Sequence, residues 1–440
     1  MHQRSDWRRV LLGDVVRPTT IREIPPATTE LPFIGMEHVA SGTGAVEGLP
    51  SARGILSASP RVRQGDVLYG RLRPYLNKVT LAPMEAYASG EFIVFRDTPE
   101  IDGSFLRWRL AAQDFVKFAC SLNAGDRPRV KWPQMAAFPL LLPSLPAQRQ
   151  IVELVEDHLS GIGRAVAGLN ATQTRLDVLE RALHQRALRG LLLRDDLSEG
   201  VGGDLVGRAQ LLDPSTLDER VWGVPSTWVW VRLGDVFKVA VGTTPSRADP
   251  SLWDGSIPWV SSGEVAFNRV RSTKESISAP SVSNLQRRVH PPGTVMLAMI
   301  GEGKTRGQAA ILDIHAAHNQ NCASIRVSET PILPEYVYAF LKERYLETRR
   351  GSSGGNQPAL NKRRIESIPI PVPPLGTQRR IVEELDAMAI TTSYVRQACS
   401  AGLSRAAALR RAILAAAFEG RLTGRHADME VIEELADVQR

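Results

Sequence analysis

Cysteine is scarce in this sequence, and long apolar runs are missing from it. The 440 residues include three cysteines, Cys120, Cys322 and Cys399, and no two of them have the CxxC spacing of a zinc site. This argues against a disulfide framework and indicates a reducing compartment. No stretch reaches the roughly 18 apolar residues of a membrane span, and the first residues carry charges with no apolar run behind them. We therefore expect a soluble, cytoplasmic protein.

Common signatures of catalytic and metal sites are also missing. The sequence has neither the Asn-Pro-Pro or Asp-Pro-Pro motif of methyltransferases nor an HExxH motif. His315, His318 and Cys322 lie close together in the sequence, but no fourth metal ligand is evident near them. Residues 298–305 resemble a phosphate-binding loop with alanine in place of its first glycine, yet a strand is expected after them, where such a loop needs a helix. We predict no catalytic residues, no metal and no cofactor bound by this chain.

Positive charge is concentrated in two separate blocks. Lysine and arginine outnumber aspartate and glutamate by 18 to 14 in residues 1–143 and by 18 to 12 in residues 223–373. The reverse holds in residues 193–222, with 3 against 7, and in residues 425–440, with 2 against 5. Two basic blocks separated by acidic segments are compatible with two sites for nucleic acid.

The strongest feature is an internal repeat. Residues 143–153 (PSLPAQRQIVE) match residues 373–383 (PPLGTQRRIVE) at seven of eleven positions, with an offset of 230. Residues 7–15 (WRRVLLGDV) match residues 228–236 (WVWVRLGDV) with an offset of 221. The changes of offset fall within the basic blocks. Each half therefore has fixed ends and a variable middle, as expected if the ends make the same contacts twice and the middles read different things.

Each basic block is predicted to be an α+β domain. Short apolar runs at 92–95 and 295–300 indicate strands, and the apolar spacing of 105–120 and 333–350 indicates helices. After each block a coiled-coil-like apolar stripe begins and continues to Gly190 or Gly420, which predicts two helices of about 45 residues, or about 65 to 70 Å each.

A helix with an apolar stripe of this length must pack on another element, and the simplest partner is the equivalent helix of the other half of the chain. We predict an α+β fold class, with two pseudo-repeated α+β domains joined by two long antiparallel coiled-coil-like helices; the alternative is that the helices only stabilise a duplicated fold as part of a bundle. The predicted boundaries are 1–143 and 223–373 for the domains, 144–192 and 374–424 for the helical spacers, 193–222 for an acidic linker and 425–440 for an acidic tail.

The ordered motifs resemble the specificity subunits of type I restriction-modification systems. In the second half they are WVWVRLGDV at 228, GTTPSR at 242, WDGSIPWVS at 253, LNK at 360 and IPIPVPPLGTQRRIVE at 368. In the first half they are GDVLYGRLRPYLNK at 65, EFIV at 91 and PLLLPSLPAQR at 139. No single motif is decisive, but their ordered recurrence over the whole chain is specific.

The resemblance implies partners and a division of labour. It implies two domains that each read one half of a split double-stranded DNA site, and two helices that set the spacer between the halves. It also implies two modification subunits that use S-adenosylmethionine to methylate adenine N6, and restriction subunits with motor and nuclease activity that bring ATP and Mg²⁺. The repeated ends would then belong to the scaffold and partner surface, and these residues are Gln148, Arg149, Gln378 and Arg379.

Candidate DNA-binding residues follow from the chemistry of the variable middles. Arginine reads guanine bidentately, asparagine and glutamine suit adenine, and lysine mostly holds phosphate. For each of them a solvated surface or a turn is the alternative. The candidates in the first block are Arg71, Arg73, Tyr75, Lys78, Arg127, Arg129 and Lys131. Those in the second block are Lys304, Arg306, Asn319, Gln320, Asn321, Arg349, Arg350, Asn356, Lys362 and Arg363.

Three functions are compatible with the sequence. The first is a DNA-reading specificity subunit without an active site of its own. The second is an enzyme, a solitary DNA methyltransferase or nuclease with a diverged site, which predicts activity from the chain alone with S-adenosylmethionine or Mg²⁺. The third is a scaffold or anti-restriction protein that binds modification subunits without reading DNA. Two unlike middles between matched ends favour the first over the third.

Overall fold

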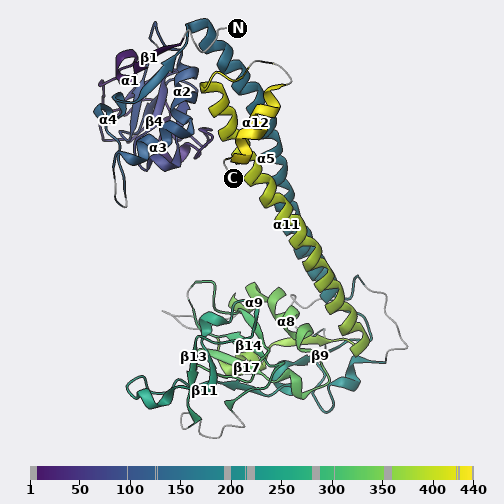
Figure 1. Ribbon diagram of the computed structural model, residues 1–440. Coiled ribbons are helices and arrows are strands. Elements are labelled where there is room, and N and C mark those ends of the chain that lie inside the picture. Colours follow the sequence, from purple (N-terminus) through teal and green to yellow (C-terminus); the bar gives the residue numbers. More distant parts are fainter. Residues whose placement is uncertain are drawn as a thin grey trace. The chain divides into compact units, whose positions relative to one another are not determined.

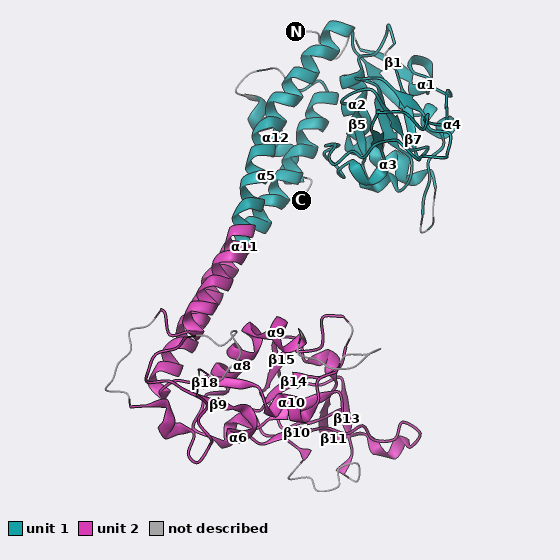
Figure 2. Ribbon diagram, turned by 180° about the vertical axis from the view of Figure 1, so that it is seen from behind, with its two compact units in different colours: residues 1–173, 397–440 teal, residues 174–396 magenta. Residues whose placement is uncertain are grey.

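The chain forms two compact units, which Figure 2 colours separately: residues 1–173 with 397–440 (unit 1), and residues 174–396 (unit 2). The computed structural model describes residues 7–96, 98–123, 125, 127–192, 200–213, 215, 223–279, 288–301, 303–350, 359–422, 424 and 427–438, without the side chains of Arg350 and Ala427. None of the described helices is long and apolar enough to cross a membrane.

Unit 1 contains a small α+β domain. Its central sheet has the order β5-β4-β7 with antiparallel pairing, and helix α2 packs on β4 and β5 (Figure 1). A second sheet has the order β2-β6-β3, and β1 pairs with β8. The elements are β1 Arg8–Leu11, α1 Leu12–Val15, β2 Phe33–Ile34, β3 Arg61–Val62, β4 Val67–Gly70, β5 Val79–Leu81, β6 Ala86–Ala88, β7 Phe92–Phe95, α2 Gly103–Ala111, α3 Gln113–Ser121, α4 Trp132–Ala136 and β8 Pro139–Leu142.

Unit 2 repeats this plan in an enlarged form. Strand β14 pairs antiparallel with β15 and β17, and α8 packs on β14 and β15, as α2 does on β4 and β5 in unit 1. The sheet grows to the order β10-β17-β14-β15-β12, a second sheet has the order β13-β11-β16, and β9 pairs with β18. The elements are β9 Val229–Arg232, α6 Leu233–Val236, β10 Val239–Val241, β11 Trp253–Val260, β12 Asn268–Val270, β13 Glu275–Ile277, β14 Val295–Ala298, β15 Ala309–Leu312, β16 Ala317–His318, β17 Cys322–Ile325, α8 Pro334–Glu343, α9 Tyr345–Arg350, α10 Lys362–Glu366 and β18 Pro369–Val372.

Two helices of 44 residues, α5 (Leu145–Leu188) and α11 (Leu375–Phe418), contribute to both units. They are antiparallel, because within unit 1 Leu154 lies beside Gly424, just past the end of α11, whereas Leu169 lies beside Gly402. Buried small residues let the helices approach closely, and those on α11 are Ala406, Ala408, Ala412, Ala416 and Ala417. The mixed α+β fold class with long helices is confirmed.

Two of the predicted helices are shorter than expected, because each is interrupted once. The helix predicted over 105–120 breaks at Ala112, whose backbone is extended. The Asp114 carboxylate stabilises the break, since it accepts hydrogen bonds from the Phe115 amide and from Arg109 in the preceding helix. The helix predicted over 333–350 breaks at Arg344, whose guanidinium lies 2.5 Å from Glu347.

The segment predicted as an acidic tail contains a helix, α12 (Ala427–Val438), that the sequence reasoning did not foresee. Its apolar face, with Ile432 and Ala436 almost fully buried, joins the core that α5 and α11 form in unit 1. Glu433 pairs with Arg405 of α11 at 3.1 Å. Because the apolar residues lie on one face of the helix, this acidic segment packs as part of the folded unit.

Candidate nucleic-acid interface

The candidates in residues 71–78 of unit 1 lie on a rigid turn after β4. Arg73 and Asn77 both have left-handed backbones, with φ of 52° and 47°, a conformation that is costly for residues other than glycine. The fold stabilises it, because the Arg73 amide donates to the Pro128 carbonyl and the Asn77 side-chain amide donates to the Ala111 carbonyl. Tyr75 at the tip is 55% exposed and available to a ligand.

A second segment of candidates joins this turn. The bridge between Leu72 and Arg129 and the hydrogen bond from the Val130 amide to the Arg71 carbonyl align the two segments. Glu91 binds both arginines: its carboxylate lies 3.5 Å from the Arg71 Nε and forms a closer ion pair with Arg129. Residues that are about 60 positions apart in the sequence therefore form one polar cluster.

The other candidates of unit 1 differ in exposure. Arg127 and Lys131 are exposed, the latter just before helix α4. Lys78 is partly buried, and its ammonium donates to the Met36 carbonyl at 2.6 Å, so it holds the turn in place more than it offers charge to solvent. Sequence reasoning had not proposed Glu91, although it stands at the offset of 230 from Asn321, which was proposed.

In unit 2, residues 319–321 form the turn between β16 and β17. Asn319 is only 7% exposed, and its side-chain oxygen accepts from the Asn321 amide, so it shapes the turn. Gln320 is exposed and hydrogen-bonds Thr244 through its side chain. Asn321 is partly exposed.

Three basic candidates of unit 2 meet around Tyr345. The Tyr345 hydroxyl donates to the Lys304 carbonyl, and Arg349 donates to both the Arg306 carbonyl and the Tyr345 hydroxyl, at 3.1 and 3.0 Å. The Lys304 side chain is exposed, whereas Arg306 is only 8% exposed and is therefore part of the interior of the domain.

The last candidates of unit 2 lie on and near the helix after this cluster. Lys362 and Arg363 are exposed on α10, where Lys362 pairs with Glu366 at 3.4 Å. The side chain of Arg350 and the whole of Asn356 lie outside the described residues.

The repeated glutamines have the same internal role in both units. Gln148 and Gln378 are fully buried, and each donates to a proline carbonyl five residues earlier, Pro143 or Pro373, at 2.9 Å. Each side-chain oxygen also accepts from the backbone amide just before a helix of its domain, that of Asp102 or that of Leu333. The neighbouring Arg149 and Arg379 are exposed, so these arginines, and not the glutamines, are available to a partner protein.

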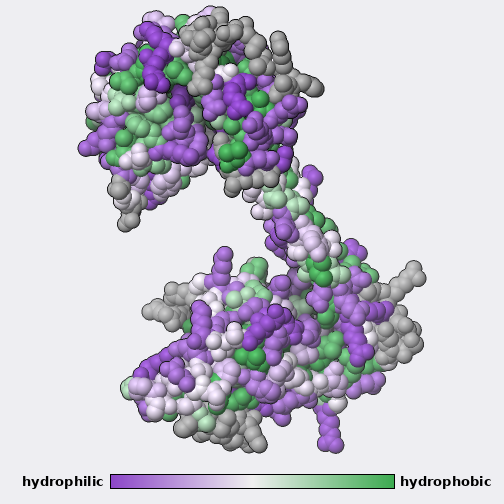
Figure 3. Space-filling view, in the orientation of Figure 1, coloured by the Kyte–Doolittle hydropathy of each residue, from purple (hydrophilic) through white to green (hydrophobic). Residues whose placement is uncertain are grey.

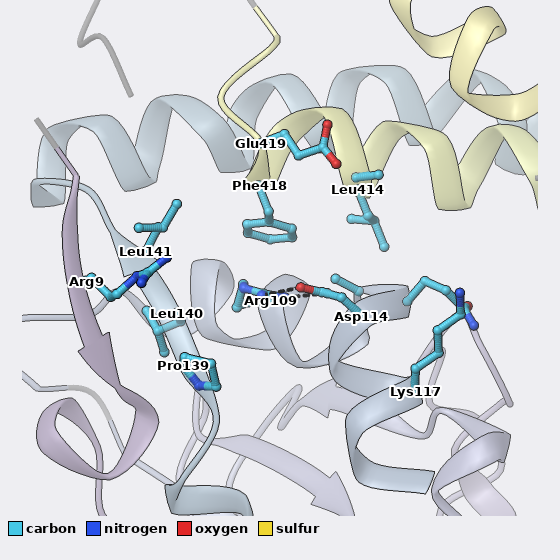
Figure 4. A pocket seen from close by; sticks show the side chains of 13 residues that line it. Arg9, Arg109, Asp114, Lys117, Pro139, Leu140, Leu141, Leu414, Phe418 and Glu419 are labelled. Atoms are coloured by element: carbon cyan, nitrogen blue, oxygen red, sulfur yellow. Dashed lines mark hydrogen bonds and ion pairs between the residues drawn. The ribbon is translucent and has the colours of Figure 1, made fainter. Parts of the chain in front are cut away.

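A cavity of about 450 Å³ in unit 1 lies apart from the candidate cluster. Figure 4 shows Arg109 paired with Asp114 on one side and Phe418 of α11 on the other. The Arg109 guanidinium lies 5.1 Å from the centre of the Phe418 ring, and its charge is balanced by Asp114. The residues that line this cavity come mainly from β1, α2, α3, β8 and α11, and none of them is a candidate for binding DNA.

The described residues contain no group of three or more histidine, cysteine or carboxylate side chains placed to hold a metal ion. Residues 309–312, after the loop that resembles a phosphate-binding motif, form strand β15, as the sequence predicted. Figure 3 shows mostly hydrophilic side chains on the visible face, with smaller apolar patches among them. The geometry thus defines a duplicated α+β protein whose copies share a scaffold and differ in partly exposed polar loops.

Comparison with known proteins agrees with this description. Residues 225–397 match the family described as type I restriction modification DNA specificity domain. The chain is 27% identical over 186 residues to the type I restriction enzyme EcoR124I/EcoR124II specificity subunit of Escherichia coli, covering 41% of this chain and 45% of that protein. It is 30% identical over 161 residues to the EcoDI specificity subunit of the same organism, covering 35% of each. The matches thus span less than half of these relatives' lengths.

Two solved structures share the fold over nearly the whole chain. One comes from work on complex assembly and conformational transition of the type I R-M system, with a TM-score of 0.72, 21% identity, and coverage of 96% of this chain and 100% of that one. The other is the HsdS subunit from Thermoanaerobacter tengcongensis, with a TM-score of 0.54, 22% identity, and coverage of 95% and 97%. The match of residues 225–397 to the type I restriction modification DNA specificity domain, together with the related specificity subunits, confirms the resemblance predicted from the motifs.

Proposed function

We propose that this chain is the DNA-reading specificity subunit of a type I restriction-modification complex and reads a bipartite, asymmetric site, one half with each unit. The observation that carries this proposal is the duplication itself. The same buried glutamine contacts recur in both units, whereas the side chains on the loops between the scaffold elements differ. Identical scaffolds with unlike loops are what two different half-sites require.

The proposed partners follow from the same duplication. Two copies of one scaffold surface, each with an exposed arginine at Arg149 or Arg379, suit two copies of one modification subunit. S-adenosylmethionine would be bound by those subunits, and ATP and Mg²⁺ by the restriction subunits that join them. In this proposal the chain contributes sequence recognition and no catalytic residue.

The test is to co-express the chain with its neighbouring modification subunit and to map adenine methylation across a genome by single-molecule sequencing. We expect a split motif with two defined halves and a fixed gap, and its loss when this chain is omitted. Replacing residues 1–143 by the corresponding block of another specificity subunit should change one half only. Methylation that is independent of this chain would refute the proposal, and complex formation without any sequence preference would favour the scaffold function.

Tyr75 and Lys131 should affect DNA binding in different ways. We expect Tyr75→Ala to weaken binding of the complex to its cognate DNA about tenfold with little change in salt dependence, because an exposed tyrosine contributes contact without charge.

Lys131→Ala should reduce the slope of log K against log salt by about one, because one phosphate contact is lost. Titrations at several salt concentrations measure both, with Lys117→Ala, an exposed lysine on α3, as the matched control. Equal affinities and slopes for all variants would contradict this prediction.

A further inference from the structure

One backbone arrangement occurs at the same place in both units. In unit 1, the Arg71 amide donates to the Glu91 carbonyl at 3.0 Å, and the Val130 amide donates to the Arg71 carbonyl at 2.9 Å. Three segments thereby meet at the end of β4: the residues that follow this strand, the turn before β7, and the segment before α4.

Unit 2 has the same two hydrogen bonds. The Met299 amide donates to the Asn321 carbonyl at 2.8 Å, and the Leu360 amide donates to the Met299 carbonyl at 3.0 Å. The strands also correspond, because β14 precedes Met299 as β4 precedes Arg71, and β17 follows Asn321 as β7 follows Glu91. The backbone therefore presents equivalent positions in the two units.

The side chains at these positions are chemically different. We call Arg71, Glu91 and Arg129 of unit 1, with Met299, Asn321 and Ala359 of unit 2, the paired reading positions. Unit 1 has two guanidinium groups and a carboxylate at these positions, whereas unit 2 has the partly exposed Asn321 and Ala359, and its Met299 is only 7% exposed and packs in the core. A shared scaffold contact would not require such a difference, but the reading of two different base pairs would.

The cluster in unit 1 retains hydrogen-bonding capacity. The Nε of Arg71 and the Oε2 of Glu91 are buried atoms, and neither makes a hydrogen bond among the described residues, although the two lie 3.5 Å apart as an ion pair. The side chains themselves are 27% and 29% exposed, so solvent reaches them. The two buried atoms face each other, so a ligand at this surface would meet the exposed parts of the two side chains.

We propose that the paired reading positions select the base pair that each unit reads, a G·C pair in unit 1 and an A·T pair in unit 2. In the major groove, arginine donates to O6 and N7 of guanine, and a carboxylate accepts from the amino group of cytosine. Asparagine pairs with N6 and N7 of adenine, and a small apolar side chain, here that of the partly exposed Ala359, contacts the thymine methyl group. Within unit 1, Glu91 also holds both arginines in place, so it is a positioning residue as well as a reader. This inference rests on the proposed function.

The test uses two nearly isosteric variants, Glu91→Gln and Asn321→Asp, in the co-expressed complex. Glu91→Gln removes the charge that holds Arg71 and Arg129, and Asn321→Asp replaces an amide that donates and accepts by a group that only accepts. We expect each variant to lower the preference for the original base about tenfold or more at one position of one half-site, with the other half and the gap unchanged. The two affected positions should lie in opposite halves, with G·C at one and A·T at the other. Single-molecule methylation maps give this readout directly.

A matched control is Glu100→Gln, which alters another surface carboxylate of unit 1 that pairs with an arginine, Arg8 on β1. It should leave the motif unchanged. Urea unfolding of each variant shows whether a loss of methylation comes from loss of folding. Because the two nearly isosteric substitutions lie in separate units, a variant that fails to fold leaves the other one as the test. Unchanged base preferences in both folded variants, or a uniform loss at all positions, would overturn the inference. If the unaltered chain gives no split motif, the proposed function fails before the variants are compared.

Discussion

Gln148→Leu lowers the free energy of unfolding of unit 1 by about 3 kcal/mol, because it removes the hydrogen bonds of three backbone groups, one of them buried and two partly buried. The Gln148 side chain is fully buried, donates to the carbonyls of Pro143 and Glu100 at 2.9 Å each, and accepts from the Asp102 amide at 2.8 Å. Leucine has a similar volume but none of these groups. The contacts join the start of α5 to the loop before α2, so their loss loosens the domain from its helix.

Urea unfolding, followed by limited proteolysis and peptide mass spectrometry, resolves the response of each unit. Gln150→Leu is the matched control, because it makes the same substitution two residues away at an exposed site of the same helix. It should change stability by no more than about 0.5 kcal/mol. Gln378→Leu should destabilise unit 2 in the same way. Equal stabilities of the Gln148 and Gln150 variants would show that the buried hydrogen bonds contribute nothing.

Acidification between pH 6.5 and 4.5 destabilises unit 2 by about 5 kcal/mol, because two buried histidines cannot take up protons in the folded state. His290 and His318 are 1% and 2% exposed, and their rings lie 4.9 Å apart. Burial lowers the pKa of His290 to about 3, with a further contribution from His318 and Arg326, and it lowers the pKa of His318 to about 4.

The direction of this effect follows from proton uptake. Above pH 6.5 both states are neutral at these residues, and acid has no effect through them. Below pH 6.5 the unfolded chain binds two protons that the folded unit does not bind until pH reaches about 4 to 3. At pH 4.5, two units below the ordinary value, each ring contributes about 2 to 3 kcal/mol of destabilisation.

The measurement is urea unfolding of unit 2 at pH 7.0 and pH 4.5 by the same proteolytic readout. His290→Gln should reduce the acid sensitivity by about half, even though it also lowers stability at pH 7.0 through its contacts with Ser324 and Arg326. His315→Asn, at an exposed histidine, is the control and should leave the acid sensitivity unchanged. An acid sensitivity that His290→Gln does not alter would contradict the assignment.

Sequence reasoning predicted local elements well where the apolar pattern was regular. The strand at 92–95 and the continuous helices α5 and α11 follow directly from the spacing of their apolar residues. The breaks at Ala112 and Arg344 were not predicted, because neither position has a proline or glycine to mark the end of a helix; ion pairs accompany them in the structure, Arg109 with Asp114 and Arg344 with Glu347. Helix α12 was not predicted either, because its apolar face is narrow and most of its remaining residues are carboxylates.

The candidate site was only partly predictable. Arg71 and Arg129 were proposed from their charge, but nothing in their spacing showed that Glu91 binds both. Arg306 and Asn319 were proposed on the same chemical grounds, and the structure places both almost wholly inside the domain. Residue type indicates what a side chain can bind, whereas exposure and neighbours depend on how distant segments meet.

The sequence by itself determined the duplication, the long helices and the class of the protein, because repeats and apolar periodicity are properties of the chain that need no contacts to be read. Only the tertiary structure decided which of the equivalent residues meet. Glu91 and Asn321 are 230 positions apart, as the repeat is, but only the backbone hydrogen bonds of Arg71 and Met299 show that three distant segments come together at the same place in each unit. Hydrogen bonds between segments far apart in sequence form only when the sheet is assembled, and for that reason the paired reading positions emerge from the fold.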